Sequence, residues 1–549
     1  MGDFVKSSTL LPANSLRLRD FPRGARWTMV AFTALGVLLR IWYQYGRSFA
    51  GDEVGTLTLL TQDYRHLLTH FEGWLTMSFY LALLRLIAHS FGKNAWVLVM
   101  PSLLAGLATI PLVAALAARL TGARTALLAA LLAAVNPYLV FYSVQIRSYM
   151  LLVAFTLGGT ICFYDWCRQP TWRNGIGCAG CSILALLMHA NALYQLVFLA
   201  VLFLIWVCRN FQTNRALNLL TRSSSIVVPM LLAVSLAAMA YLPLRRPMSE
   251  LRAQWSDAPP TPIDYVHFVA ELYFAPGFFL IPTVVLLTAG IWRATQDNHA
   301  LLLLGAGIVT PPIAASFLGV SHFPWAYGRY FIPVLPLLLI FIAEGTSRAM
   351  SFRAIYVGWL IVVALIASWI PGLQKIVIQK DDYRWNQVAD YLKRDITPAD
   401  VIVPIDWTSG FHLKPSFDEG DARIVSLDRY LAGLGDTSST RRVYIVTTEN
   451  PITAATVQYT IGKVQVVTYT GSSKREIAGK LLDDLRRSLN KRVSPRMASQ
   501  YQACLDLMAA LSLPDEQCEY RTLYYKCLMR TRRQRYARPQ MLSLAVDER

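Results

Sequence analysis

The chain has 549 residues, of which 54% are hydrophobic and only 16% are charged. This composition excludes a water-soluble globular protein of ordinary type, in which about 25% of the residues are charged. The formal net charge of +18 does not indicate nucleic-acid binding, because the basic residues are scattered through short loops instead of gathering on one polar face. An integral membrane protein is expected.

Apolar stretches recur through the first 371 residues, and crossing the hydrocarbon core takes about 20 mostly apolar residues. Basic residues precede the first stretch without a small-residue cleavage site after it, so this span is expected to be retained. About eleven spans are predicted, at residues 27–45, 97–118, 125–142, 149–165, 176–189, 192–208, 226–243, 278–292, 300–318, 330–346 and 354–371.

The distribution of arginines predicts the orientation of these spans. Residues 1–26 are expected to be a cytoplasmic segment, because every loop that then lies inside contains at least one arginine. These are Arg119, Arg124, Arg168, Arg173, Arg209, Arg215, Arg222, Arg293, Arg348 and Arg353. An odd number of spans places residues 372–549 on the outer side, which is the periplasm if the protein resides in a bacterial inner membrane.

One apolar segment, Phe79 to Phe91, is not counted as a span, because it is short and carries Arg85 and His89. It is predicted to be an amphipathic helix in the membrane interface, with Leu81, Leu84 and Ile87 toward lipid. The first outer loop then runs from about residue 46 to residue 94, within a transmembrane domain of residues 27–371.

The acidic pair Asp52 and Glu53 follows the first span directly. A carboxylate next to apolar sequence can act as a general base or hold a cation, so both residues are candidates for catalysis or for a divalent metal ion. A solvated pair of loop residues is an equally good interpretation of the sequence alone.

Further candidates are arginines and aromatic residues at the outer ends of spans. A guanidinium group matches two phosphate oxygens, and a tyrosine can stack on a sugar. The alternative is an arginine that snorkels to the interface beside an aromatic belt. The candidates for substrate binding are Arg147, Tyr149, Arg329, Tyr330, Arg245 and Arg246, together with His189, for which a structural role is the more common one.

Residues 372–549 have the composition of a soluble domain. A helix is predicted at 383–394, and short β-branched runs at 400–403 and 442–447 are typical of strands. The expected fold is therefore an all-α polytopic membrane domain followed by a small α/β domain. No glycine-rich nucleotide-binding loop follows a strand, so a nucleotide-sugar donor is not indicated.

Several of these motifs, in this order, resemble the GT-C glycosyltransferases, in particular the group with the protein O-mannosyltransferases and the lipid A aminoarabinose transferases. The likeness covers nearly the whole membrane domain. The motifs are Arg40 and Trp42 followed by Asp52-Glu53, then Phe91-Gly92 with Pro101-Ser102, Asn136-Pro137 through Tyr149, Gly328-Arg329-Tyr330 with Pro333 and Pro336, and Asp382-Tyr383-Arg384-Trp385 through Val403.

This resemblance implies transfer of a monosaccharide from a polyprenyl phosphate to an acceptor hydroxyl at the outer membrane face, with inversion at the anomeric carbon. Asp52 would be the base. Glu53 would position Asp52 or bind a divalent ion that some members use. Arg147 and Arg329 would stabilise the leaving phosphate. The acceptor, which could be a glycolipid or lipopolysaccharide, another glycan or a protein, does not follow from these residues.

Two departures from the family pattern keep other functions open. Where members often have His-Pro-Pro-Leu, this chain has Gly73-Trp74-Leu75-Thr76-Met77, and Val99-Met100 replaces an arginine usual before Pro101-Ser102. A catalytically inactive scaffold is one alternative. A polytopic lipid or glycan transporter is another, although it predicts paired broken helices and charges at the bilayer midplane.

Overall fold

The computed structural model divides into two compact units, Met1–Gly46 with Leu59–Gln379, and Arg47–Thr58 with Lys380–Arg549. The structure describes residues 16–45, 47, 49, 52–60, 62–69, 78–211, 216–241, 281–297, 304–311, 313, 329, 331–350, 355–378, 385–397, 400–404, 424–425, 427–432, 442–447, 457–461, 464–469, 474–489, 498–511, 513, 517, 520–521 and 523–524.

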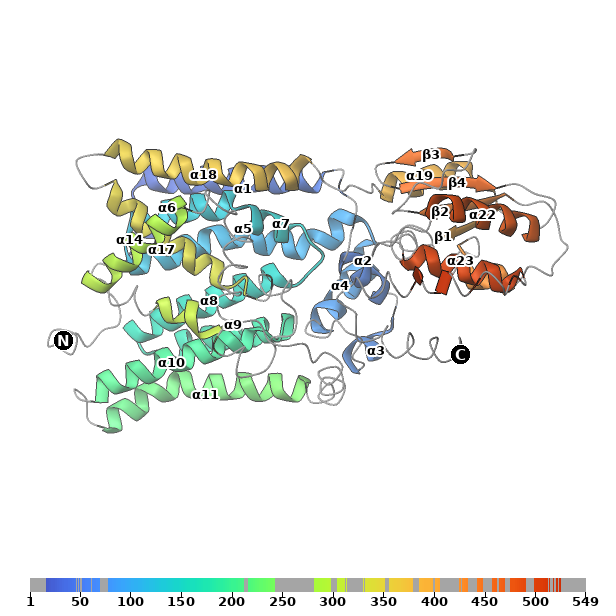
Figure 1. The fold of residues 1–549 in the computed structure, drawn as a ribbon. Helices are drawn as coiled ribbons and strands as arrows, with labels where there is room; N and C mark the ends of the chain where they lie inside the picture. Colours follow the sequence, from blue (N-terminus) through green and yellow to red (C-terminus); the bar gives the residue numbers. More distant parts are fainter. Residues whose placement is uncertain are drawn as a thin grey trace, which may run out of the picture. The chain divides into compact units, whose positions relative to one another are not determined.

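The first unit is a bundle of apolar helices that run alongside one another (Figure 1). Its described helices are α1 (Arg23–Gln44), α3 (Tyr64–Thr69), α4 (Ser78–Phe91), α5 (Ala95–Leu120), α6 (Ala123–Val135), α7 (Pro137–Ser143), α8 (Tyr149–Arg168), α9 (Trp172–Met188), α10 (Ala192–Phe211), α11 (Ala216–Tyr241), α14 (Ile281–Asp297), α17 (Val334–Ala349) and α18 (Ile355–Ile378), with a 3-10 turn, η2, at Leu18–Asp20. Residues 304–311 are also helical.

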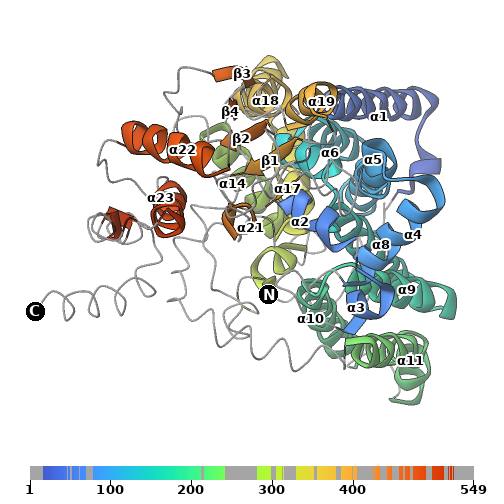
Figure 2. The ribbon, with the colours of Figure 1, turned by 90° about the vertical axis from the view of Figure 1, so that its right-hand side faces the viewer.

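Helices α5, α6, α8 and α17 form the centre of the bundle, where the largest core cluster lies. Helix α9 packs between α8 and α11, as Figure 2 shows. Helix α1 contacts α5, α6 and α7 on one face and exposes large apolar side chains such as Trp27 and Leu38 on the other. An exposed apolar face of this kind is suited to contact with lipid.

Each predicted span has helical residues at its position. Among the described helices, four are long and apolar enough to cross a membrane, namely α1, α5, α8 and residues Thr221–Met239 of α11. The bent pair α6 and α7 raises this number to five. The all-α polytopic fold is thereby confirmed, while the full number of crossings and their orientation stay predictions.

The predicted span at 125–142 is broken in the middle. Helix α6 ends at Val135, α7 begins at Pro137, and the two are bent by 60°. Proline has no N–H group and cannot continue the hydrogen-bond ladder of α6. The side chain of Asn136 instead caps α7 by accepting from the backbone N–H groups of Tyr138 and Leu139, both at 3.1 Å. The sequence analysis predicts a span at these residues but does not predict the break within it.

The apolar segment of the predicted first outer loop forms helix α4, at almost the predicted bounds. Its predicted orientation is wrong, because Leu81 and Leu84 are buried instead of facing lipid. They pack inward because α4 lies against α5 and α9, and the exposed large apolar side chains of α4 are Leu86 and Phe91. Arg85 donates to the backbone carbonyls of Leu60 and Gln62, which ties α4 to the chain before α3.

Helices α14 and α17 approach each other unusually closely through two glycines. A Cβ atom on Gly290 would lie 2.0 Å from the carbonyl oxygen of Phe341, and one on Gly345 would lie 2.0 Å from that of Leu286. Small residues at such crossings let helix backbones pack tightly in a membrane, where packing replaces the hydrophobic driving force.

We expect Gly290→Ala to destabilise the protein in detergent by about 1–3 kcal/mol, because the added methyl group collides with backbone atoms that cannot rotate away. Gly180→Ala in α9 is the matched control, since a Cβ atom there meets nothing within 4 Å. Thermal or denaturant unfolding of both variants measures the difference. Equal stabilities would show that α14 and α17 are not held by this contact.

The second unit contains a four-stranded sheet in the order β1-β2-β4-β3. Strand β1 (Val401–Pro404) is parallel to β2 (Val443–Thr447), whereas β3 (Val457–Ile461) and β4 (Val464–Tyr469) complete an antiparallel portion. The other described elements are α2 (Asp52–Leu59, all but its last residue in this unit), α19 (Trp385–Asp395), α21 (Leu427–Ala432), α22 (Lys474–Leu489) and α23 (Ala498–Ala510).

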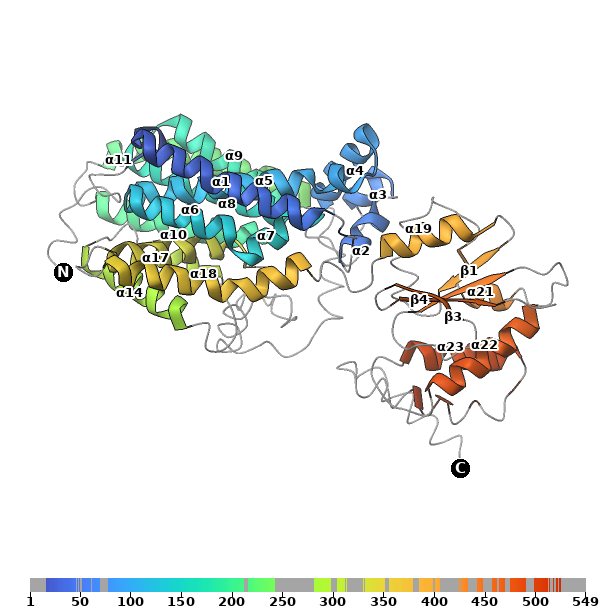
Figure 3. The ribbon, with the colours of Figure 1, turned by 90° about the horizontal axis from the view of Figure 1, so that it is seen from above.

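The sheet is covered on both faces, as Figure 3 shows. Alternate residues of β2 point to opposite faces: Val443 and Ile445 pack with α21, α22 and α23, while Tyr444 and Val446 pack with α19. This confirms the predicted small α/β domain, with α19 and the first two strands near their predicted positions. Strands β3 and β4 were not predicted.

Candidate functional site

The turn between α7 and α8 carries two predicted site residues, Arg147 and Tyr149, inside the first unit. Both side chains are buried, with Arg147 4% exposed. The turn is fixed by the hydroxyl of Ser102 on α5, which donates to the backbone carbonyl of Arg147 at 2.8 Å. The phenol oxygen of Tyr80 on α4 lies 3.3 Å from the same hydroxyl. Helices α4 and α5 therefore set the position of the turn.

Aromatic rings surround the guanidinium group of Arg147. Its Cζ atom lies 6.0 Å from the ring centroid of Tyr149, within the range of a cation–π contact. Tyr149 in turn meets Tyr142 edge to face, with centroids 5.1 Å apart, and its ring lies 5.3 Å from that of His189. A buried arginine held among aromatic rings is suited to bind an anion whose attached group is apolar or stacks on a ring.

His189 lies in the turn between α9 and α10, outside both helices, and is completely buried. Its Nδ1 atom accepts from the backbone N–H of Asn191 at 3.1 Å. Burial lowers the pKa of the imidazole well below its usual range, and the positive charges of Arg147 and Arg329 lower this pKa further. The neutral ring therefore carries its proton on Nε2. Because both charges act on one ring, the structure brings Arg147, Arg329 and His189 into one electropositive region.

This neutral histidine predicts a dependence of stability on pH. As pH falls below about 6.5, the unfolded chain binds a proton at His189 before the native protein does. Native stability should then fall by up to about 1.4 kcal/mol per pH unit from this residue. We expect His189→Gln to remove that part of the slope between pH 6.5 and pH 5 in detergent unfolding experiments. His89→Gln, at an exposed position on α4, is the control, and equal slopes for both variants would contradict the prediction.

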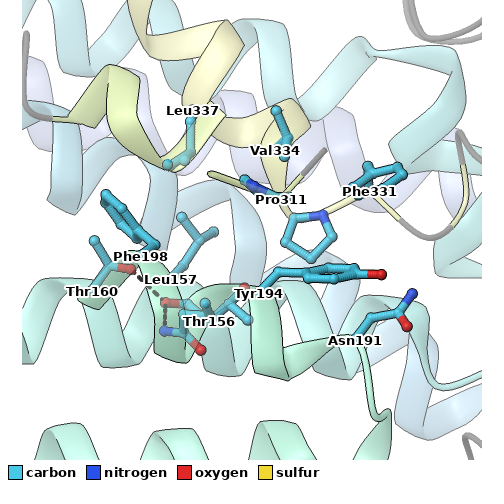
Figure 4. A pocket seen from close by; sticks show the side chains of 13 residues that line it. Thr156, Leu157, Thr160, Asn191, Tyr194, Phe198, Pro311, Phe331, Val334 and Leu337 are labelled. Atoms are coloured by element: carbon cyan, nitrogen blue, oxygen red, sulfur yellow. Dashed lines mark hydrogen bonds between the residues drawn. The ribbon is translucent and has the colours of Figure 1, made fainter. Parts of the chain in front are cut away.

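A pocket of about 460 Å³ lies beside this region, between α8, α10, residues 304–311 and the start of α17. Figure 4 shows Asn191 and Phe331 at one end and Thr160, Phe198 and Leu337 at the other. Its walls are mainly apolar, and the rings of Tyr194 and Phe331 stack at 5.4 Å. Asn191 and Phe331 each come two residues after a member of the electropositive region.

The acidic pair of the predicted first outer loop belongs to the second unit. Glu53 is buried, and its two carboxylate oxygens accept from the two terminal nitrogens of Arg47 at 2.5 and 2.8 Å. Both side chains are almost inaccessible, at 3% for Arg47 and 1% for Glu53. Asp52 is the first residue of α2. The Glu53 carboxylate is thus compensated by a bidentate partner, and the interpretation as a solvated loop residue is wrong for it.

Arg47 could not have been assigned from the sequence, because nothing in the pattern links it to Glu53 beyond a short separation. Other predicted site residues lie outside the described residues, namely Arg245, Arg246, Tyr330 and the side chain of Asp52. Within the described part of the chain, no group of three or more His, Cys, Asp or Glu side chains is placed to hold a metal ion.

Residues 77–233 match the family model described as dolichyl-phosphate-mannose-protein mannosyltransferase. These residues run from α4 into α11 and include Arg147, Tyr149 and His189. No curated protein sequence matches the chain.

Among solved structures, the chain is similar to ArnT from Cupriavidus metallidurans in two states. The apo form aligns with a TM-score of 0.50 and 14% identity, covering 81% of this chain and 98% of ArnT. The form bound to undecaprenyl phosphate aligns with a TM-score of 0.51 and 13% identity, covering 80% and 97%. The chain therefore shares the fold of ArnT, a fold of the GT-C type.

Proposed function

We propose that the protein transfers a monosaccharide from a polyprenyl-phosphate donor to an acceptor hydroxyl, with inversion, at the outer face of a bacterial inner membrane. The carrying observation is that the buried Arg147 lies over the ring of Tyr149, which in turn contacts the buried ring of His189, on a fold shared with a protein solved with undecaprenyl phosphate. The guanidinium groups of Arg147 and Arg329, whose charges both act on His189, match the charge of a phosphate diester and of the monoester that leaves.

The proposed chemistry is a single displacement. Asp52 takes the proton of the acceptor hydroxyl as its oxygen forms a bond to the anomeric carbon, and the bond from that carbon to the phosphate oxygen breaks. The polyprenyl phosphate leaves as an anion, which Arg147 and Arg329 stabilise. Tyr149, Tyr330 and His189 are proposed to contact the sugar or phosphate, and Arg245 and Arg246 to add positive charge for the donor.

Glu53 is proposed to position Asp52. Both of its oxygens are already bound by Arg47, and a carboxylate held in this way fixes the backbone of the residue before it. The pairing with Arg47 supports a positioning role for Glu53 over a role as ligand to a divalent ion, because the charge that would attract the ion is neutralised by the arginine.

The pocket beside His189 is proposed to hold the isoprene units next to the phosphate. Apolar walls suit a hydrocarbon chain, and the end at Asn191 and Phe331 is the one that adjoins His189 and Arg329 in the sequence. The phosphate and the start of its tail would then be bound by the same unit.

A transporter or flippase is the second candidate, because the break between α6 and α7 and the buried charge of Arg40 in α1 are features found at transport sites. Proteoliposomes with a polyprenyl phosphate carrying a radiolabelled sugar, together with an extract of glycolipid, glycan and protein acceptors, distinguish the two functions. A transferase yields a labelled product, whereas a flippase moves the labelled lipid across the bilayer without one.

The same experiment uses nucleotide-linked sugars as matched donors. Label should reach the acceptor fraction only from polyprenyl-phosphate donors. Transfer from nucleotide sugars alone would overturn the proposed donor, and movement of label without product would establish the transporter. If neither product nor movement occurs with any donor, the inactive scaffold is favoured.

A further inference from the structure

Arg40 is a completely buried arginine near the C-terminal end of the membrane helix α1. All of its hydrogen-bond acceptors within the described residues are neutral: its Nε donates to the Ser143 hydroxyl at 2.9 Å and its Nη1 to the carbonyl of Gly36 at 3.0 Å. A charge in such a place is costly, so it is retained where it performs a specific task.

That task concerns the break between α6 and α7. The carbonyl of Ala133 would pair with the N–H of residue 137 in a continuous helix, but residue 137 is a proline. The carbonyl of Ala134 would pair with the N–H of Tyr138, which donates instead to Asn136. These two carbonyls accept from Nη2 and Nη1 of Arg40, at 3.5 and 3.1 Å. The cation also lies at the negative end of the α6 dipole.

The hydrogen bond from Arg40 to Ser143 joins the end of α6 to α7. Ser143, the last residue of α7, accepts from Arg40 Nε and donates to the carbonyl of Leu139. Gly106 on α5 makes room for it, because a Cβ atom on Gly106 would lie 2.0 Å from the Ser143 hydroxyl oxygen. One side chain therefore holds both halves of the broken helix, immediately before the turn that carries Arg147.

We propose that Arg40 is a positioning residue that sets the angle between α6 and α7 and thereby places Arg147 for the phosphate of the donor. This inference rests on the proposed function for its catalytic consequence, while its structural content stands independently. Arg40 itself does not touch the substrate, since its side chain is enclosed by α1, α6 and α7.

The structural content is tested by hydrogen–deuterium exchange on the full-length protein in detergent. Arg40→Met should raise exchange at residues 137–149, because the two carbonyls and Ser143 lose their common donor. Arg26→Met, the same change at an exposed position of α1, should not. Ser143→Ala is a milder variant that serves if Arg40→Met does not fold, and it should raise exchange in the same residues. If Arg40→Met or Ser143→Ala folds and its exchange at residues 137–149 equals that of the wild type, the proposal is overturned.

The catalytic consequence is tested with a polyprenyl phosphate as ligand and with turnover of its sugar-linked form. Displacing a positioned group by about 1 Å can reduce turnover about 10²-fold, and this loss is expected for Arg40→Met. The double variant Arg40→Met/Arg147→Ala should bind polyprenyl phosphate no more weakly than Arg147→Ala alone, because each change removes the same interaction, that of Arg147 with the phosphate. Additive losses would overturn the link to Arg147.

These two measurements fail independently. If the wild-type protein does not bind a polyprenyl phosphate or use its sugar-linked form, the proposed function falls, while local exchange at residues 137–149 still decides whether Arg40 holds the break. If the wild type binds the ligand and exchange does not change in the variants, Arg40 is not the positioning residue.

Discussion

Replacement of Asp52 by asparagine should lower sugar transfer by about 10²–10⁴-fold, the usual contribution of a general base. Asparagine has nearly the same shape but cannot accept the proton of the acceptor hydroxyl. Asn is also favourable at the start of a helix, where Asp52 begins α2, so the fold should be kept. Turnover of the variant and the wild type is compared at equal folded concentration and saturating donor.

Asp63→Asn provides the matched control for this experiment. Asp63 lies in the same outer loop, is exposed, and accepts from the backbone N–H of His66 at the start of α3. Asparagine can make the same hydrogen bond, so its transfer rate should equal that of the wild type. A rate for Asp52→Asn within a few-fold of this control would remove Asp52 from the role of base.

Breaking the ion pair of Arg47 and Glu53 should cause the largest loss of stability. Glu53→Gln leaves the arginine charge buried without its carboxylate, which costs about 3–5 kcal/mol at a fully enclosed site. The side chains are 3% and 1% exposed, so solvent cannot take over the lost interaction. Because Asp52 is the neighbouring residue, turnover of the protein that remains folded should fall as well.

The control for this change is Glu476→Gln on α22 in the same unit. Glu476 pairs with Lys480 at 2.8 Å, but the side chains are 41% and 50% exposed, and such surface pairs contribute about 0–1 kcal/mol. Unfolding in detergent should therefore separate the two glutamine variants clearly. If Glu53→Gln is as stable as Glu476→Gln, the Arg47 pair does not hold the acidic segment.

The helices of the membrane unit could be predicted because an apolar run of fixed length is a direct property of the sequence. The bend at Asn136 and Pro137 was missed although both residues signal a helix boundary, because the apolar composition continues across it. The orientation of α4 was wrong for a related reason: Leu81 and Leu84 suit contact with lipid or with protein equally well. Only the packing of α4 on α5 and α9 decides between them.

The candidate site was only partly predictable. Arg147 and Arg329 could be selected as charges that the orientation rule does not require, but the contact of Tyr149 with the ring of His189 depends on the tertiary structure. The partner of Glu53 is a second such fact, since a bidentate pair depends on side-chain geometry that spacing alone does not encode. The task of Arg40 follows only from knowing which carbonyls the break at Pro137 leaves without partners.

The most direct test of the proposed enzyme is the release of polyprenyl phosphate, followed by mass spectrometry, from purified wild-type protein in detergent with a panel of polyprenyl-phosphate sugars. The proposal predicts that release occurs with at least one donor, requires acceptor, and matches the sugar transferred one for one. Absence of release with every donor and acceptor extract, from protein that is folded, would contradict the assignment as a polyprenyl-phosphate-dependent glycosyltransferase.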